Sequence, residues 1–207
     1  MHDHHDHSHD PITSVSEDSS FAIREAAIRE LLIEKGVFTA DELRQRVEAM
    51  DERTPAIGAQ IIARAWVDTE FKKRLLEDAE TAIQNLNIKT STTSRIVAVE
   101  NTDQVHNVIV CTLCSCYPIA ILGRPPAWYK SMAYRSRTVS NPRGVLSEFG
   151  LELDRQVEVR VHDSTADIRY IVIPKRPPKT EHMSESELVN LITRDSMIGV
   201  AQAKIPE

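Results

Sequence analysis

The only three cysteines of this 207-residue chain, Cys111, Cys114 and Cys116, lie within six residues of one another. Cysteines spaced this closely cannot build a disulfide framework, which must join distant parts of a chain. A Cys-x-x-Cys-x-Cys turn can instead direct three sulfur atoms at one ion. Because sulfur is a soft ligand, such a claw favours a transition metal over magnesium or calcium. The region around residue 111 is therefore expected to fold as a metal-binding loop.

The number of available ligands limits the kind of metal site. Three sulfurs and the backbone nitrogens of Ser115 and Cys116 would give five ligands, leaving a sixth octahedral position open. A structural zinc site needs four ligands, and His106 is the only histidine near the cluster, with His162 and His182 remote in sequence. His106 is more typical of a hydrogen-bonded core residue than of a ligand. Spacing alone leaves three readings open: an open transition-metal site, a zinc site, or no metal.

Composition indicates a soluble globular protein, with 41% hydrophobic and 27% charged residues. The length fits one domain of ordinary size with an extended arm. No apolar run approaches the roughly 20 residues that span a bilayer, and no signal peptide is evident, so we expect a cytoplasmic protein without a membrane partner. The net charge is −6 and no basic stripe is present, which argues against a nucleic-acid partner.

Three regions follow one another along the chain. Residues 1–20 are expected to form a disordered tail rich in His and Asp, since five of the eight histidines lie in the first ten residues. This tail is either simply solvated or a handle that collects metal. Residues 21–94 are expected to form a helical arm, and residues 95–207 an α+β metal-binding catalytic domain. The predicted fold class is α+β, with the arm followed by a compact mixed α/β domain that carries the claw loop.

Local signals define the expected elements. Apolar pairs at helical spacing predict a helix over 21–35 that stops at Gly36. A capping-box pattern opens a second helix at Thr39, Pro55 opens a third, and Asp68 caps a fourth running towards Leu86. Short β-branched or alternating runs then predict strands. Expected later elements are strands at 96–99, 108–110, 157–161 and 169–173, and helices at 128–137, at 141–150 and from Ser184, where Ser184 and Glu187 form a second capping-box pattern.

The segment from Val110 to Cys116 resembles the signature of the nitrile hydratase α subunit and of the related thiocyanate hydrolase γ subunit. The likeness covers most of residues 21–200. It continues through the segments 100–102, 105–107, 122–130, 134–137, 142–143, 148–150, 171–174 and 193–199. The cysteine motif is the most specific part of it.

The resemblance implies roles for the claw residues. Cys111, Cys114 and Cys116 would bind the metal through sulfur, and Ser115 and Cys116 also through deprotonated backbone amides. The family oxidises Cys114 to sulfinic acid and Cys116 to sulfenic acid. Thr112, where iron-type members usually carry Ser, favours non-corrin cobalt(III) over iron(III).

The resemblance also implies a hydro-lyase that converts a nitrile to an amide. The trivalent ion would act as a Lewis acid on the small nitrile substrate or on a bound water, and the Cys116 sulfenate would be the nearest nucleophile or base, with Ser115 beside it. Arginines of a β subunit would hold the oxidised cysteines, so a hetero-oligomer is expected. The sequence also allows thiocyanate hydrolysis to carbonyl sulfide and ammonia, or a non-catalytic metal-binding or delivery protein.

Several residues depart from the family pattern or stay ambiguous. Ile119-Ala120 stands where relatives usually carry Trp-Pro, which should reshape the substrate pocket. Trp66 is expected to pack in the core, and Trp128 and Tyr129 to pack the claw loop. Two further arginines, Arg135 and Arg137, suit either an interface with acids or a structural role. No acid–base pair is predicted, and Asp163 receives no role.

Overall fold

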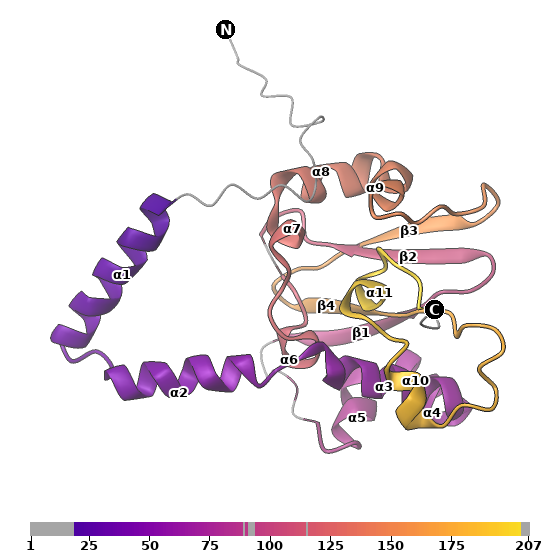
Figure 1. Ribbon diagram of the computed structural model, residues 1–207, viewed down its shortest axis with the longest axis horizontal. Coiled ribbons are helices and arrows are strands. Elements are labelled where there is room, and N and C mark those ends of the chain that lie inside the picture. Colours follow the sequence, from indigo (N-terminus) through magenta and orange to yellow (C-terminus); the bar gives the residue numbers. More distant parts are fainter. Residues whose placement is uncertain (1–18, 89, 91–93, 115, 204–207) are drawn as a thin grey trace, which may run out of the picture.

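The computed structural model describes residues 19–88, 90, 94–114 and 116–203. This part of the chain folds into helices and four strands, so the predicted α+β class is confirmed. Figure 1 shows two helices projecting from a mixed body of strands and short helices. The predicted His/Asp-rich tail lies outside the described residues except at its last two positions, which begin the first helix. No helix in the described part is long and apolar enough to cross a bilayer.

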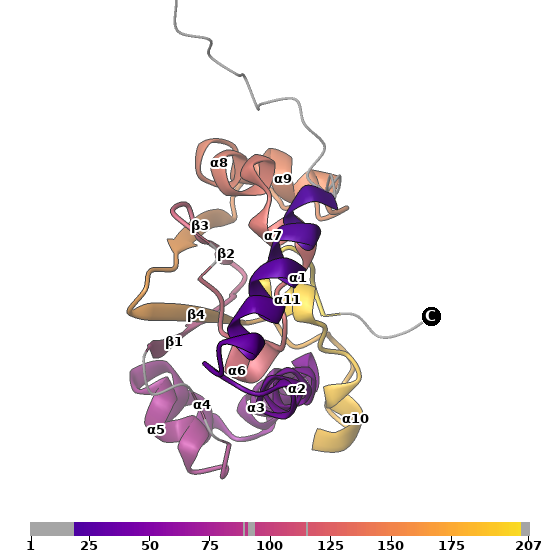
Figure 2. The ribbon, with the colours of Figure 1, turned by 90° about the vertical axis from the view of Figure 1, so that its left-hand side faces the viewer.

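The projecting part consists of α1 (Ser19–Glu34) and α2 (Ala40–Asp51). Gly36 adopts a φ of 68° after α1, the left-handed conformation that glycine accepts without steric cost. The predicted capping box at α2 is present, with Glu42 N donating to Thr39 Oγ1 over 3.1 Å and Thr39 N donating to Glu42 Oε2 over 2.7 Å. No residue of α2 is buried. Among the described residues the two helices therefore lack a covering layer. Figure 1 shows them beside the body, and Figure 2 shows the molecule from the side of these helices.

The next helices belong to the packed body. Helix α3 (Pro55–Val67) contacts three short helices, α6 (Ile119–Leu122), α10 (Glu185–Val189) and α11 (Arg194–Ile198). Helices α4 (Thr69–Glu77) and α5 (Ala79–Gln84) lie against the first strand. The single helix predicted from 69 towards 86 is wrong, because Asp78 leaves helical geometry and caps α5 by accepting from Thr81 N. Of the described residues within 21–94, only those of α1 and α2 and their connection thus stand clear of the body.

The strands pair with partners distant in sequence. β1 (Arg95–Glu100) runs parallel to β4 (Ile168–Ile173), and β2 (Val105–Val110) runs parallel to β3 (Glu158–Asp163). Their registers align Val110 with Asp163. The chain leaves β2 directly into the cysteine loop, so this register places Asp163 beside the start of the loop.

The remaining helices lie beside β2 and β3 (Figure 1). They are α7 (Ala127–Lys130), α8 (Met132–Ser140) and α9 (Pro142–Glu148). Helix α8 contacts β2, and α9 contacts β3. The helix predicted over 128–137 is divided, because Ser131 is extended and its hydroxyl caps α8 by accepting from Tyr134 N. Trp128, Tyr129, Tyr134 and Phe149 pack edge-on or tilted in one aromatic group. This group supplies the apolar support beneath the loop.

Candidate metal centre

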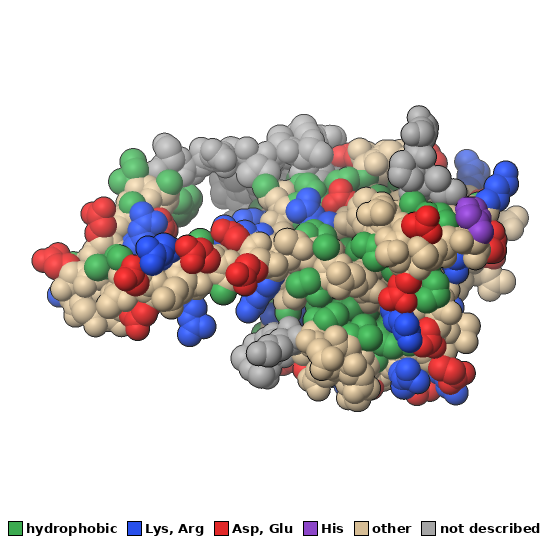
Figure 3. All heavy atoms as spheres, turned by 60° about the horizontal axis from the view of Figure 1, so that its bottom comes forward, with side chains coloured by type: hydrophobic (Ala, Val, Ile, Leu, Met, Phe, Trp, Pro, Cys, Tyr) green, Lys and Arg blue, Asp and Glu red, His purple; other side chains and the backbone are tan. Residues whose placement is uncertain are grey.

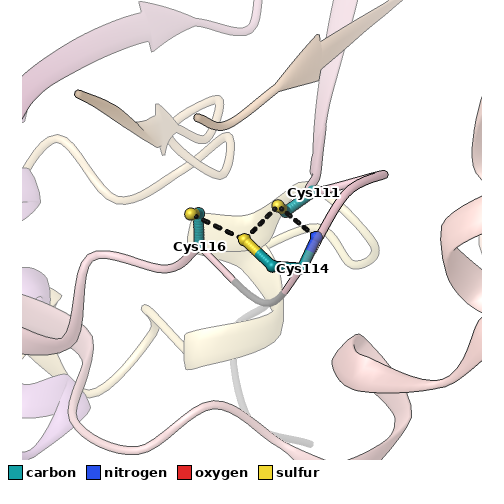
Figure 4. A group of neighbouring side chains, drawn as sticks. All are labelled: Cys111, Cys114 and Cys116. Carbon is teal, nitrogen blue, oxygen red and sulfur yellow. Dashed lines mark hydrogen bonds between the residues drawn. The ribbon is translucent and has the colours of Figure 1, made fainter. Parts of the chain in front are cut away.

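The three cysteines converge on one point, as Figure 4 shows. Cys111 Sγ lies 3.4 Å from Cys114 Sγ, and Cys114 Sγ lies 3.0 Å from Cys116 Sγ. All three sulfurs are within 4.8 Å of one another. Cys111 and Cys116 are buried, whereas Cys114 is exposed. The predicted sulfur claw is therefore assembled at the surface, with two of its sulfurs recessed. Ser115 lies outside the described residues.

The sulfur spacing bears on the geometry of an ion at this point. With metal–sulfur bonds of about 2.3 Å, two sulfurs at 90° lie about 3.3 Å apart, and at the tetrahedral angle about 3.8 Å. The observed 3.0 and 3.4 Å match adjacent corners of an octahedron. Both separations are short enough for the sulfurs to be neighbouring ligands of one transition-metal ion.

The histidines near the site are engaged elsewhere. His106 is buried in β2, with Nε2 2.7 Å from the Gly199 carbonyl oxygen and Nδ1 3.2 Å from Asn101 Nδ2. Burial lowers its pKa, which keeps the ring neutral. This confirms the expectation of a core residue. Among the described residues, the three cysteines are the only cluster of metal-ligating type, so a four-ligand zinc site is not completed there.

Electrostatics at the cluster call for a cation. Burial, a hydrogen bond with Cys114 and the charge of Cys111 together raise the pKa of Cys116 to about 12, against a smaller lowering by Arg169. Three ionised sulfurs this close repel one another. A bound metal ion removes the conflict because a coordinating thiol is deprotonated outright. The donor set therefore suits a metal of high charge.

The loop backbone is held from two sides. Asp163, at the end of β3, accepts from Thr112 N over 2.9 Å and from Thr112 Oγ1 over 2.5 Å. Arg135 donates through Nε to the Cys111 carbonyl over 3.0 Å and through Nη2 to the Thr112 carbonyl over 2.5 Å. Sequence reasoning gave Asp163 no role, since only the pairing of β2 with β3 brings it to the loop.

The second half of the loop is supported by α7. The Tyr129 hydroxyl donates to the Cys116 carbonyl over 2.9 Å, and the rings of Tyr117 and Tyr129 meet edge-on at 5.0 Å. The prediction that Tyr129 packs the claw loop is confirmed. Trp66 lies away from the loop and donates through Nε1 to the Pro174 carbonyl, in agreement with its expected packing role.

A cavity of about 250 Å³ adjoins the segment that follows the claw. Apolar side chains and two arginines form its walls. The lining residues include Met50, Arg53, Tyr117, Ile119, Ala120 and Arg169. Ile119 and Ala120, the two positions expected to reshape the substrate pocket, line this cavity, so their side chains affect its size.

Comparison with known protein families identifies the family to which this fold and cysteine cluster belong. The sequence model described as "Nitrile hydratase, alpha chain" matches residues 19–201. The chain belongs to the nitrile hydratase alpha chain family. The family match includes the projecting helices, the strands and the claw, and so covers nearly all of the described structure.

Individual relatives agree with the family assignment. The chain is 49% identical over 195 residues to the alpha subunit of the high-molecular weight cobalt-containing nitrile hydratase of Rhodococcus rhodochrous, covering 93% of this chain and 96% of the relative. It is 42% identical to the thiocyanate hydrolase gamma subunit of Thiobacillus thioparus, covering 94% and 84%. A double mutant of the Fe-type nitrile hydratase of Comamonas testosteroni Ni1 superposes with a TM-score of 0.86 at 39% identity, covering 92% of this chain and 94% of that one.

Proposed function

We propose that this chain is the alpha subunit of a cobalt-type nitrile hydratase, which adds water to a nitrile to form the corresponding amide. The observation that carries the proposal is the sulfur triangle of Cys111, Cys114 and Cys116, with neighbouring sulfurs at octahedral spacing. Membership of the nitrile hydratase alpha chain family supports the same reaction.

Cobalt(III) is the proposed metal. The three cysteine sulfurs would hold it together with the backbone amides of Ser115 and Cys116. The fold itself accommodates either metal, since a relative of closely similar fold is Fe-type. The choice of cobalt rests on Thr112 and on relatives described as cobalt-containing. When bound, the trivalent ion supplies Lewis acidity towards a nitrile or water.

Each of the three cysteines would have its own chemical state and role in the reaction. Buried Cys111 would stay a thiolate, supported by the Cys114 backbone N–H, which donates to its sulfur over 3.3 Å. An external oxidant would convert exposed Cys114 to sulfinic acid and neighbouring Cys116 to sulfenic acid, which are steps of the thiol oxidation ladder. The sulfenate oxygen of Cys116 would act on the nitrile carbon or on water as nucleophile or base.

A partner subunit is required to complete the proposed enzyme. The α1 side chains Phe21, Ile23 and Ile28 are 66%, 70% and 58% exposed, and Figure 3 shows apolar side chains on the projecting arm. Leu113, inside the claw, is 85% exposed. Apolar groups of this size are normally covered in a complex. We propose that a β subunit covers these apolar side chains, which places the metal centre at the subunit interface.

A cytoplasmic location is part of the proposal, because a reducing compartment keeps neighbouring thiols out of disulfides until metal is bound.

Thiocyanate hydrolysis is the second candidate function. It is favoured by the 42% identity to a thiocyanate hydrolase gamma subunit and by the loss of the usual Trp-Pro at Ile119-Ala120. The two reactions share the claw and differ in the substrate pocket.

One set of measurements tests these proposals. The chain purified with its native partners should contain about one cobalt per chain, carry added oxygen mass on Cys114 and Cys116, and convert nitriles to amides. Release of ammonia and carbonyl sulfide from thiocyanate, without nitrile turnover, would instead establish the second function. Stoichiometric zinc on unmodified thiols would reject both enzymes and support a metal-binding or delivery protein.

A further inference from the structure

Helix α8 packs against β2 and contacts the chain where it leaves this strand. The Tyr134 hydroxyl donates to the Ile109 carbonyl over 2.6 Å. The next residue, Arg135, donates to the carbonyls of Cys111 and Thr112 over 3.0 and 2.5 Å. Two consecutive helix residues thus fix backbone groups on both sides of the point where the strand ends and the claw begins.

One guanidinium joins two successive peptide carbonyls at the first cysteine. Arginine suits this task because its N–H donors lie in one plane at fixed angles, whereas lysine offers a single mobile ammonium. A hydrogen bond from a charged donor is also stronger than a neutral one. The orientation of the Cys111 peptide, and with it the direction of the sulfur, is therefore tied to α8.

The helix that presents Arg135 is itself firmly placed. Ser131 caps its first turn through Tyr134 N over 3.1 Å. Tyr134 is fully buried, and its ring lies 4.9 Å from that of Trp128. A positioning side chain is most effective on a rigid element of this kind.

We propose that Arg135 is a positioning residue of the metal centre, which holds the first turn of the claw in the shape that receives and retains the ion. It contacts the loop backbone rather than the sulfurs, and so acts through Cys111 and Thr112. The inference rests on the proposed function, because it presupposes a metal at the claw. It adds a contribution from this chain to the support expected from partner arginines.

Arg137 provides a matched control. It lies on the same helix two residues later, and its guanidinium bonds to Glu148 at the end of α9. Arg137→Gln therefore removes a charged hydrogen-bonded arginine from α8 while the contacts to Cys111 and Thr112 remain.

The test compares Arg135→Gln, Arg135→Lys and Arg137→Gln in the cobalt-loaded full chain produced with its partner subunit. Cobalt release into excess chelator is timed, and the visible sulfur-to-cobalt absorption is recorded. We expect Arg135→Gln to release cobalt roughly tenfold faster or more, as is typical when support behind a metal ligand is lost, and to shift the absorption band. Arg135→Lys should restore part of the retention, and Arg137→Gln should match the parent in both measurements.

Equal release rates and unchanged spectra in Arg135→Gln and Arg137→Gln would overturn the inference alone. A parent protein without tightly held cobalt would overturn the proposed function and the inference with it. If Arg135→Gln does not accumulate as folded protein, the Arg135→Lys variant decides the question. Its cobalt release should still exceed that of Arg137→Gln by several-fold, and equality would refute the role of Arg135.

Discussion

Replacing Gly199 by Ala should weaken the strand that leads into the claw. Gly199 ends α11 with a φ of 94°, and a Cβ at this position would lie 2.0 Å from the Asn107 carbonyl oxygen and 2.9 Å from Val108 Cα. Both atoms belong to the backbone of β2, so neither can move as a flexible side chain could. The same glycine accepts the hydrogen bond of His106 through its carbonyl.

The expected cost has two parts. The left-handed backbone conformation costs a residue with a side chain about 1–2 kcal/mol, and forcing an extra methyl group into packed structure costs about 1–3 kcal/mol. Gly199→Ala should therefore reduce the free energy of unfolding by about 2–5 kcal/mol. Gly150→Ala is the matched control, because Gly150 also has a positive φ, of 77°, but a Cβ there would meet nothing within 4 Å. Its expected cost is the conformational part alone, about 1–2 kcal/mol.

Urea unfolding followed by circular dichroism would measure both variants against the parent. The reasoning requires Gly199→Ala to lose clearly more stability than Gly150→Ala. Equal losses would show that α11 moves away from β2 at little cost, which would refute the close packing argued here. A cobalt measurement on the folded fraction should also show weaker metal retention in Gly199→Ala, since β2 positions Cys111.

Three further predictions concern the claw, the cavity and the response to acid. Cys114→Ala should lose cobalt and nitrile hydration together in elemental analysis and amide assays, and retained activity would exclude the proposed site. Ile119→Trp should lower kcat/KM for bulky nitriles about tenfold more than for small ones, and an unchanged ratio would place substrate outside the cavity. Because burial lowers the pKa of His106, the unfolded state binds protons more readily, so stability should fall as pH drops below about 6.5. His106→Gln should flatten this pH dependence in urea titrations, and an identical slope would contradict a neutral buried ring.

Local features of the fold were predictable from the sequence. The capping boxes at Thr39 and Ser184 form as expected, because each depends on residues three positions apart. The helix breaks at Asp78 and Ser131 were missed. In both places a side-chain cap interrupts a helix, while the apolar spacing continues across the break.

The claw was predictable for the same reason, since its three sulfurs come from six consecutive residues. The residues that support the claw loop could not be predicted from the sequence. Arg135 and Asp163 reach the loop only because α8 packs on β2 and β3 pairs with β2 in parallel. Parallel pairing of distant strands depends on the whole fold, and the sequence around Asp163 carries no local sign of its partner.

The parallel pairing of β2 with β3 has a consequence for biosynthesis. The cysteine loop is translated about fifty residues before Asp163, the residue that closes its first turn. A ribosome-bound chain that has just exposed the three thiols still lacks β3, and cobalt supplied at that moment would meet an unbraced peptide. Cobalt should therefore be inserted after release and folding of the chain, when β3 has formed and Asp163 holds the cysteine loop.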